Sequence, residues 1–149
     1  MDQAKPVTIL LVEDDPGHAR LVEKNLRRAK IMNEIIQFNN GQELLDFLGD
    51  ADVTAGTASI LSLPLLVLLD LNMPVMDGFE ALRRLKADDQ TKYIPVIILT
   101  TTYDPGDIVR CYELGCNVYI TKPVSYEEFS EVINRLSLFL SIVTIPHGG

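Results

Sequence analysis

Three acidic residues directly follow two apolar runs and are the first candidates for chemistry. Asp70 ends the run at residues 65–69, and Glu13 and Asp14 end the run at residues 7–12. A single acid in such a place is usually a turn or helix-capping residue, but several carboxylates crowded together repel one another unless a cation neutralises them. An all-oxygen site that retains several water molecules suits Mg²⁺. If the fold brings the three acids together, they predict a divalent-cation site.

Two further polar residues end apolar runs later in the chain, Thr100 after residues 94–99 and Lys122 after residues 117–121. The Lys122 ammonium can pair with Asp70 or with an anion attached to it, and the Thr100 hydroxyl can donate to that anion. A carboxylate beside a cation, a lysine and a hydroxyl is equipped for phosphoryl transfer, with Asp70 as the in-line nucleophile.

The predicted cation has a defined set of protein ligands. Asp14 and Asp70 bind it directly, Glu13 binds through a water molecule, and a backbone carbonyl at Asn72 completes the set. The expected ion is Mg²⁺, with Mn²⁺ as the alternative.

Five strand-length segments alternate with helical patterns and must position these residues. The strands are expected at residues 7–12, 34–38, 65–70, 94–100 and 117–121. Alternation of this kind predicts an α/β fold, with a parallel sheet, helices on both faces and right-handed crossovers. Strand order 2-1-3-4-5 is among the commonest and makes the first and third strands neighbours. Asp70 would then lie beside Glu13 and Asp14, with Thr100 and Lys122 on its other side.

Local signals mark the ends of the expected helices. Asp15 and Asp104 each precede a proline and are expected to be N-caps. Gly49 and Gly115 are expected to end the second and fourth helices, and a capping box at residues 125–128 opens the last one.

The 149 residues are expected to form one domain with a core at about 7–142. Residues 50–62 are low in charge and are interpreted as an insertion loop, and residues 144–149 as a flexible tail. The net charge of −8 argues against a nucleic-acid-binding surface. Without a signal-peptide pattern or a membrane-length apolar run, we expect a cytoplasmic protein with Cys111 and Cys116 as reduced packing residues.

Taken together, these landmarks resemble the receiver domains of two-component response regulators, over almost the whole chain. The matching residues are Glu13-Asp14, the segment 69–74 with Asp77-Gly78, Thr100 after residues 97–99, and Lys122-Pro123. The resemblance implies a flavodoxin-like (βα)5 fold like that of a chemotaxis receiver.

The same resemblance implies a function. Asp70 would take a phosphoryl group from a sensor histidine kinase with Mg²⁺ bound, becoming 4-aspartylphosphate. Thr100 would turn toward the phosphoryl group, Tyr119 would follow it, and a protein-binding surface for a downstream target would change. The insertion and the length also resemble the small response regulators that partner bacterial phytochromes, chiefly cyanobacterial ones.

Some positions near the acceptor bear on how such a site would work. Thr101 stands where the family often has alanine or glycine, so it is expected to narrow access to Asp70. Asn72 and Thr102 occupy positions that tune the lifetime of the phosphate in the family. His18 is expected to be a solvent-facing helix residue.

Other functions stay open from the sequence. A phosphorelay intermediate or a phosphate sink would use the same acceptor. A Mg²⁺-dependent aspartyl phosphohydrolase would typically have a second aspartate two residues after the nucleophile, where this chain has Asn72, and a carboxamide cannot act as general acid or base. We therefore expect a signalling protein that is not an enzyme.

The last expected helix is apolar on two sides. One stripe contains Leu136, Phe139, Leu140 and Val143, while Leu138, Ile142 and Ile145 lie nearly opposite. An apolar second face near the end of the chain predicts a homodimer that uses Leu138, Ile142 and Ile145.

Overall fold

The structure, a computed structural model, describes residues 7–53, 64–102, 104–122, 125, 127, 128 and 131. The described strands are β1 (Thr8–Val12), β2 (Ile35–Phe38), β3 (Leu65–Asp70), β4 (Val96–Thr100) and β5 (Val118–Thr121). The helices assigned along the described chain are α1 (Pro16–Arg28), α2 (Gly41–Val53), α3 (Gly78–Ala87) and α4 (Pro105–Leu114).

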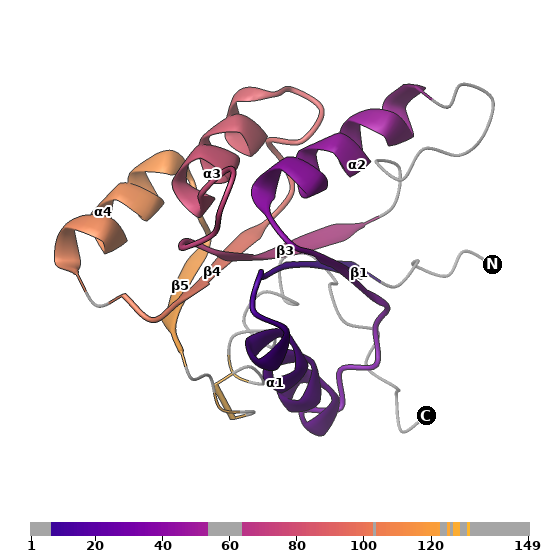
Figure 1. Ribbon diagram of the computed structural model, residues 1–149, viewed down its shortest axis with the longest axis vertical. Helices are drawn as coiled ribbons and strands as arrows, with labels where there is room; N and C mark the ends of the chain where they lie inside the picture. The colour runs from indigo at the N-terminus through magenta and orange to yellow at the C-terminus, as the bar shows by residue number, and fades with distance from the viewer. Residues whose placement is uncertain are drawn as a thin grey trace.

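The five strands form one parallel sheet in the order β2-β1-β3-β4-β5, which confirms the predicted topology (Figure 1). The register explains why distant residues meet at one edge. Val12 is paired with Leu69, so the residues that follow them, Glu13 and Asp70, come next to each other. Thr100 is paired with Thr121 across β4 and β5, and Lys122 follows one residue later.

Alternate residues of the strands point to opposite faces of the sheet and contribute to two separate apolar layers. One layer joins the sheet to α1 through Leu11, Leu26 and Leu68, and the other joins it to α2, α3 and α4 through Leu44 and Leu69. Figure 1 shows α1 on one face of the sheet and the other three helices on the opposite face. All six residues of β3 are buried, as expected for a central strand covered on both faces.

The helix starts follow the predicted signals. The Asp15 carboxylate accepts the backbone N–H groups of Gly17 and His18 at 2.8 and 3.1 Å. Gly115 ends α4 in the left-handed conformation with φ of 107°, which a residue without a Cβ adopts at no steric cost. Ser125 and Glu128 exchange backbone-to-side-chain hydrogen bonds of the predicted capping box.

The prediction that Gly49 ends the second helix is wrong, because α2 continues through it to Val53. A glycine costs a helix interior about 1 kcal/mol relative to alanine, and the apolar contacts of the buried Leu44 and Leu48 offset that cost. The first residues of the predicted insertion at 50–62 are therefore helical.

Several predictions fall outside the described residues. These are the insertion from residue 54 on, the dimer face at Leu138, Ile142 and Ile145, and the tail at 144–149. Among the helices that the structure describes, we find none with the length and apolar character needed to cross a membrane.

Candidate functional site

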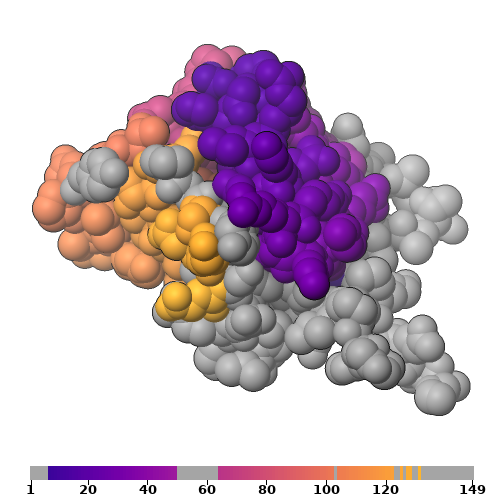
Figure 2. All heavy atoms as spheres, turned by 90° about the horizontal axis from the view of Figure 1, so that it is seen from below, coloured from indigo at the N-terminus to yellow at the C-terminus, as the bar shows by residue number. Residues whose placement is uncertain are grey.

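A hollow of about 200 Å³ opens at the carboxyl ends of the central strands. Its lining contains most of the residues predicted for phosphoryl transfer, together with others from the start of α1. The lining residues are Glu13, Asp14, Asp15, His18, Asp70, Asn72, Thr101 and Lys122. The end of β5, which supplies Lys122, lies beside α1 on the face shown in Figure 2.

The three predicted acidic ligands do meet. Glu13, Asp14 and Asp70 can each offer one carboxylate oxygen, and these oxygens lie within 4.8 Å of one another. Glu13 and Asp70 are buried, whereas Asp14 is exposed. The cluster therefore has one side inside the protein and one side open to solvent. This donor set fits a hard divalent cation, because such ions prefer oxygen ligands and retain water on their open side. Asn72 is also in the lining, while ligation by its carbonyl stays a prediction.

Lys122 contacts two of these acids. Its ammonium makes a close ion pair with Oε1 of Glu13 and lies 3.7 Å from Oδ2 of Asp70. The pairing with Asp70 foreseen from sequence is therefore present, but Glu13 is the nearer partner. The second oxygen of Glu13 accepts the backbone N–H of Asp15 at 3.2 Å, which fixes the carboxylate where the lysine meets it.

The protein groups around Asp70 disfavour its charged form. Burial is the largest cause and the nearby negative charge of Glu13 the second, and together they raise the pKa of Asp70 from 3.8 to about 6. The positive charge of Lys122 acts in the opposite direction, and the backbone N–H of Asn72 donates to the carboxylate and lowers the pKa as well. A bound cation would add the positive charge that this carboxylate lacks.

Neither predicted switch residue is among the residues that line the hollow. Thr100 is fully buried, and its hydroxyl oxygen accepts the backbone N–H of Thr102 at 3.3 Å. The Tyr119 hydroxyl donates to the carbonyl of Thr102 at 2.8 Å, and burial is the main cause that raises the pKa of Tyr119 to about 12. Thr100 and Tyr119 are thus joined through the backbone of one residue. Exposed Thr101 is the threonine that lines the hollow.

A further tyrosine extends this connection to the surface. The backbone N–H of Tyr119, on the edge strand β5, donates to the hydroxyl oxygen of Tyr112 at 3.2 Å. Tyr112 belongs to α4, and about half of its surface is exposed. The hydrogen bonds therefore run from buried Thr100 through Thr102 and Tyr119 to the outside of α4.

His18 is a site residue that sequence reasoning missed. It was expected to face solvent, and its side chain is indeed 46% exposed, but Nδ1 lies 3.2 Å from the Lys122 ammonium. A signal was available, because the N-cap at Asp15 places His18 in the first turn of a helix that begins at the same sheet edge as the acids.

The loop between Asp70 and α3 returns closely to the end of β3. The backbone N–H of Gly78 donates to the carbonyl of Leu71 at 2.9 Å, and a Cβ on Gly78 would stand 2.7 Å from Cα of Leu71. Within the loop, Val75 has φ of 70° and is 83% exposed, a strained conformation for a β-branched residue. The glycine that follows Asp77 is thus needed for the backbone to pass the end of β3 at Asp70 and Leu71.

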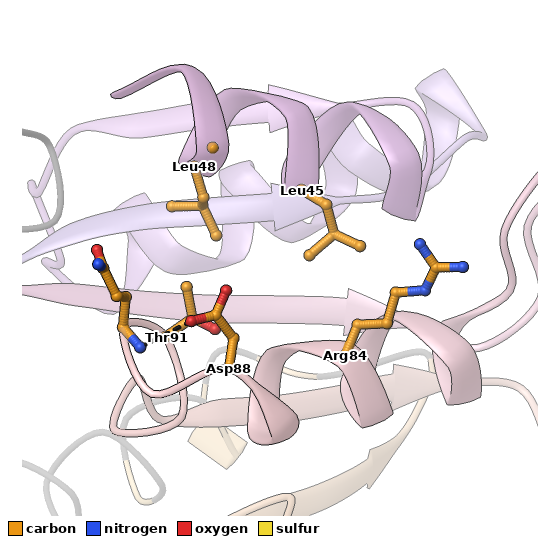
Figure 3. A pocket seen from close by; sticks show the side chains of 7 residues that line it. Leu45, Leu48, Arg84, Asp88 and Thr91 are labelled. Carbon is orange, nitrogen blue, oxygen red and sulfur yellow. Dashed lines mark hydrogen bonds between the residues drawn. The ribbon is translucent and has the colours of Figure 1, made fainter. Parts of the chain in front are cut away.

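Two other features do not belong to this site. A hollow of about 280 Å³ lies between α2 and α3, lined by Leu45 and Leu48 on one side and Arg84, Asp88 and Thr91 on the other (Figure 3). It lacks the convergence of acids and lysine found at the strand ends. The two cysteines, Cys111 and Cys116, are free and buried, and mainly because of burial their pKa values are raised to about 11 and about 12, as expected for inert packing residues.

Comparison with known proteins agrees with this site. The family model described as the response regulator receiver domain matches residues 9–134. Response regulator Rcp1 of Synechocystis sp. is 36% identical over 142 residues, which cover 95% of this chain and 94% of Rcp1. A crystal structure of its Mn²⁺-bound form has a TM-score of 0.70 and covers 95% of this chain and 99% of that one.

Two further solved structures are similar along nearly the whole chain. The receiver domain of a response regulator from Rhodospirillum rubrum is 50% identical, with a TM-score of 0.71 and coverage of 94% and 97% of the two chains. The phosphorylated cyanobacterial phytochrome response regulator RcpA is 33% identical, with a TM-score of 0.72 and coverage of 95% and 99%. From the family match, the fold and the shared length, this chain belongs to the response regulator receiver domains, signalling proteins that bind a divalent metal, take phosphoryl groups from histidine kinases and act on downstream targets.

Proposed function

We propose that this protein is a response regulator in which Asp70 accepts the phosphoryl group, with Mg²⁺ held by Glu13, Asp14 and Asp70. The observation that carries the proposal is the meeting of three carboxylates within 4.8 Å with a lysine 3.7 Å from Asp70. No single acid of this group would be informative alone, but together they form an acceptor, a cation site and a counter-charge in one hollow.

In the proposed reaction, an Asp70 carboxylate oxygen attacks the phosphorus of a phosphohistidine in line with the P–N bond. The new O–P bond forms as the P–N bond breaks, and the electron pair returns to the imidazole of the kinase. The cation, when bound, neutralises charge on the carboxylates and on the phosphoryl oxygens. Lys122 donates a hydrogen bond to the phosphoryl group, which its distance to Asp70 allows after a small shift away from Glu13.

The output of the proposed switch begins at Thr100. Thr100 is not in the lining of the hollow, so its hydroxyl would have to turn to reach a phosphoryl oxygen, and turning would break the hydrogen bond that it accepts from the Thr102 N–H. The Thr102 carbonyl is the acceptor of the Tyr119 hydroxyl. A change at Thr100 would therefore reach Tyr119 through Thr102, whose backbone is hydrogen-bonded to both side chains. The surface of α4 and β5 would present the change to a downstream protein target.

The proposed phosphodonor is a sensor histidine kinase of the phytochrome class, in the cytoplasm. Support comes from RcpA, which is a cyanobacterial phytochrome response regulator, and from a bacteriophytochrome response regulator, AtBRR, that is 34% identical with a TM-score of 0.73. Signalling without catalytic turnover is proposed because the position two residues after Asp70 is Asn72, which cannot supply the acid–base group of a phosphohydrolase.

The test is phosphotransfer from purified candidate kinases with radiolabelled ATP and Mg²⁺. Label is expected on the wild type and lost in Asp70→Asn, which keeps the size of the side chain, while Asp89→Asn in the exposed turn after α3 serves as the matched control. Label on Asp70→Asn would show that the acceptor lies elsewhere. Rapid passage of label from Asp70 to a histidine phosphotransfer protein would favour a relay or a sink over a terminal switch.

The proposed assembly is a homodimer through Leu138, Ile142 and Ile145, which rests on the sequence pattern alone. Sedimentation at micromolar concentration is expected to show a dimer that Leu138→Glu with Ile142→Glu converts to a monomer. A wild-type monomer at that concentration, unchanged by the double substitution, would contradict the proposal.

A further inference from the structure

Three atoms that can accept a hydrogen bond surround the Lys122 ammonium, two of them within hydrogen-bonding distance and the third at ion-pair distance. These acceptors are Oε1 of Glu13, Nδ1 of His18 at 3.2 Å and Oδ2 of Asp70 at 3.7 Å. We propose that His18 is a positioning residue that holds the Lys122 amine beside Asp70 when the divalent cation is bound. The inference rests on the proposed function and adds to it a residue with a defined task.

The chemistry of the contact defines the state of His18. An ammonium group has no lone pair and can only donate, so Nδ1 must accept, and the proton of the neutral ring then resides on Nε2. That nitrogen lies 4.0 Å from Oδ2 of Asp15, the helix N-cap whose other oxygen accepts the backbone N–H of His18. The ring is therefore placed between the lysine amine and the carboxylate that caps its own helix.

His18 differs from the other two acceptors in one respect. Glu13 and Asp70 belong to the cluster of oxygens that fits the cation, so a bound cation draws on the same carboxylates that hold the lysine. Because Nδ1 of His18 lies outside that cluster, its hydrogen bond is not in competition with the metal. Of the three described acceptors, His18 is the one whose hydrogen bond to Lys122 is not weakened when the divalent cation is bound.

The hydrogen bond to His18 restricts the position of the Lys122 amine during phosphoryl transfer. Lys122 must leave Glu13 and present a proton to the incoming phosphoryl group, and a fixed third partner limits where the amine can go. Without it the long lysine side chain regains rotamer freedom that an immobilised side chain has lost. Misplacement of a catalytic group by about 1 Å can slow a reaction by about a hundredfold. Because Glu13 and Asp70 also contact the Lys122 amine, we expect loss of the His18 acceptor to slow phosphorylation by less, about tenfold.

Three variants separate the acceptor from the bulk of the ring. His18→Leu keeps an apolar side chain of similar size without an acceptor, and His18→Asn can place its amide oxygen near the position of Nδ1. Arg20→Leu puts the same leucine at an exposed position of the same helix. Phosphorylation by acetyl phosphate at saturating Mg²⁺ is expected to be slow in His18→Leu, close to wild type in His18→Asn and unchanged in Arg20→Leu.

A second readout needs no phosphodonor. The ¹⁵N-detected ammonium signal of Lys122 in the Mg²⁺-loaded protein should be retained in wild type and His18→Asn and lost to solvent exchange in His18→Leu. Because the chain has no tryptophan, Mg²⁺ affinity is measured by calorimetry, and it should be similar in all variants, since His18 is not a ligand.

The outcomes are distinguishable. Equal rates and equal Lys122 signals in wild type and His18→Leu would overturn the inference, as would an equal loss in His18→Leu and His18→Asn, which would mean that the acceptor is not what matters. Failure of the wild type to accept phosphate from any donor would instead count against the proposed function, and the Lys122 signal would still decide the role of His18.

Discussion

Burial and the charge of Glu13 act together on Asp70 at the end of β3. They raise its pKa from 3.8 to about 6, so between these values the folded protein binds a proton that the unfolded chain has released. Stability therefore decreases as pH rises through this window in the absence of metal. The ionised Asp70 carboxylate is thus held at a cost to the stability of the fold, and a bound cation would reduce that cost.

This cost can be measured by comparing Asp70→Asn with the wild type in urea, with a chelator present. At about pH 7.5 we expect the variant to have a higher free energy of unfolding, by up to about 3 kcal/mol, because 1.36 kcal/mol corresponds to each pKa unit. As the pH falls through 6 toward 4, the wild-type carboxyl becomes protonated and the difference should shrink. A difference that does not change with pH would contradict this explanation.

Gly78 can be tested in a similar way. Its missing Cβ lets the loop pass the backbone of Asp70 and Leu71, so Gly78→Ala should lower the free energy of unfolding by about 1–3 kcal/mol, the usual cost of overpacking. Gly49→Ala is the matched control, because a Cβ there would meet open space in the middle of α2. That control should be neutral or more stable by up to about 1 kcal/mol. A Gly78→Ala protein as stable as the control would show that the loop can yield.

At the scale of elements, α4 is attached to the edge of the sheet by Tyr112. Its hydroxyl accepts the backbone N–H of Tyr119, a group that β5 cannot pair with another described strand. Tyr112→Phe should therefore destabilise the protein by about 0.5–1.5 kcal/mol and speed hydrogen exchange at the Tyr119 amide. Tyr119→Phe removes a different bond, the one to the Thr102 carbonyl, and should leave that amide more protected than Tyr112→Phe does. Equal exchange in both variants would contradict the assignment.

Much of the fold could be predicted from the sequence. The spacing of apolar residues and the residues that mark the ends of strands and helices are both local features of the chain. The fully apolar run of β3 indicates a strand covered on both faces, and the acid that follows it marks the strand end. Once the strand order is chosen, the meeting of Glu13 with Asp70 follows from the register. The extent of α2 could not be predicted in this way, since whether Gly49 ends the helix depends on the apolar contacts of its neighbours.

The details of the site depend on side-chain directions, which spacing does not reveal. Sequence reasoning placed Lys122 with Asp70, whereas the structure makes Glu13 the nearer partner. The approach of His18 to Lys122 joins residues 104 positions apart and depends on the angle at which α1 leaves the sheet. Thr100 was expected near the acceptor, but which of the successive threonines faces the hollow is decided by the alternation of β4.

For the molecule as a whole, cation binding should increase the free energy of unfolding. A ligand that binds only the folded state at about 100 times its Kd adds about 2.7 kcal/mol to the free energy of unfolding. Mg²⁺ should therefore raise the melting temperature of the wild type, and Asp14→Asn should reduce that increase at equal concentration. Asp89→Asn, whose carboxylate pairs with Lys92 away from the cluster, should respond like the wild type. An identical response of Asp14→Asn would remove Asp14 from the ligand set.

The burial of β3 on both faces limits how far the strand that carries Asp70 can move during signalling. A strand packed between two close-packed layers cannot move without disrupting the packing of both layers. The backbone that carries Asp70 is therefore held rigidly in place. The rim of the sheet and the outer helices can then move in response to the site while the backbone beneath Asp70 stays in place, because all six residues of β3 are buried.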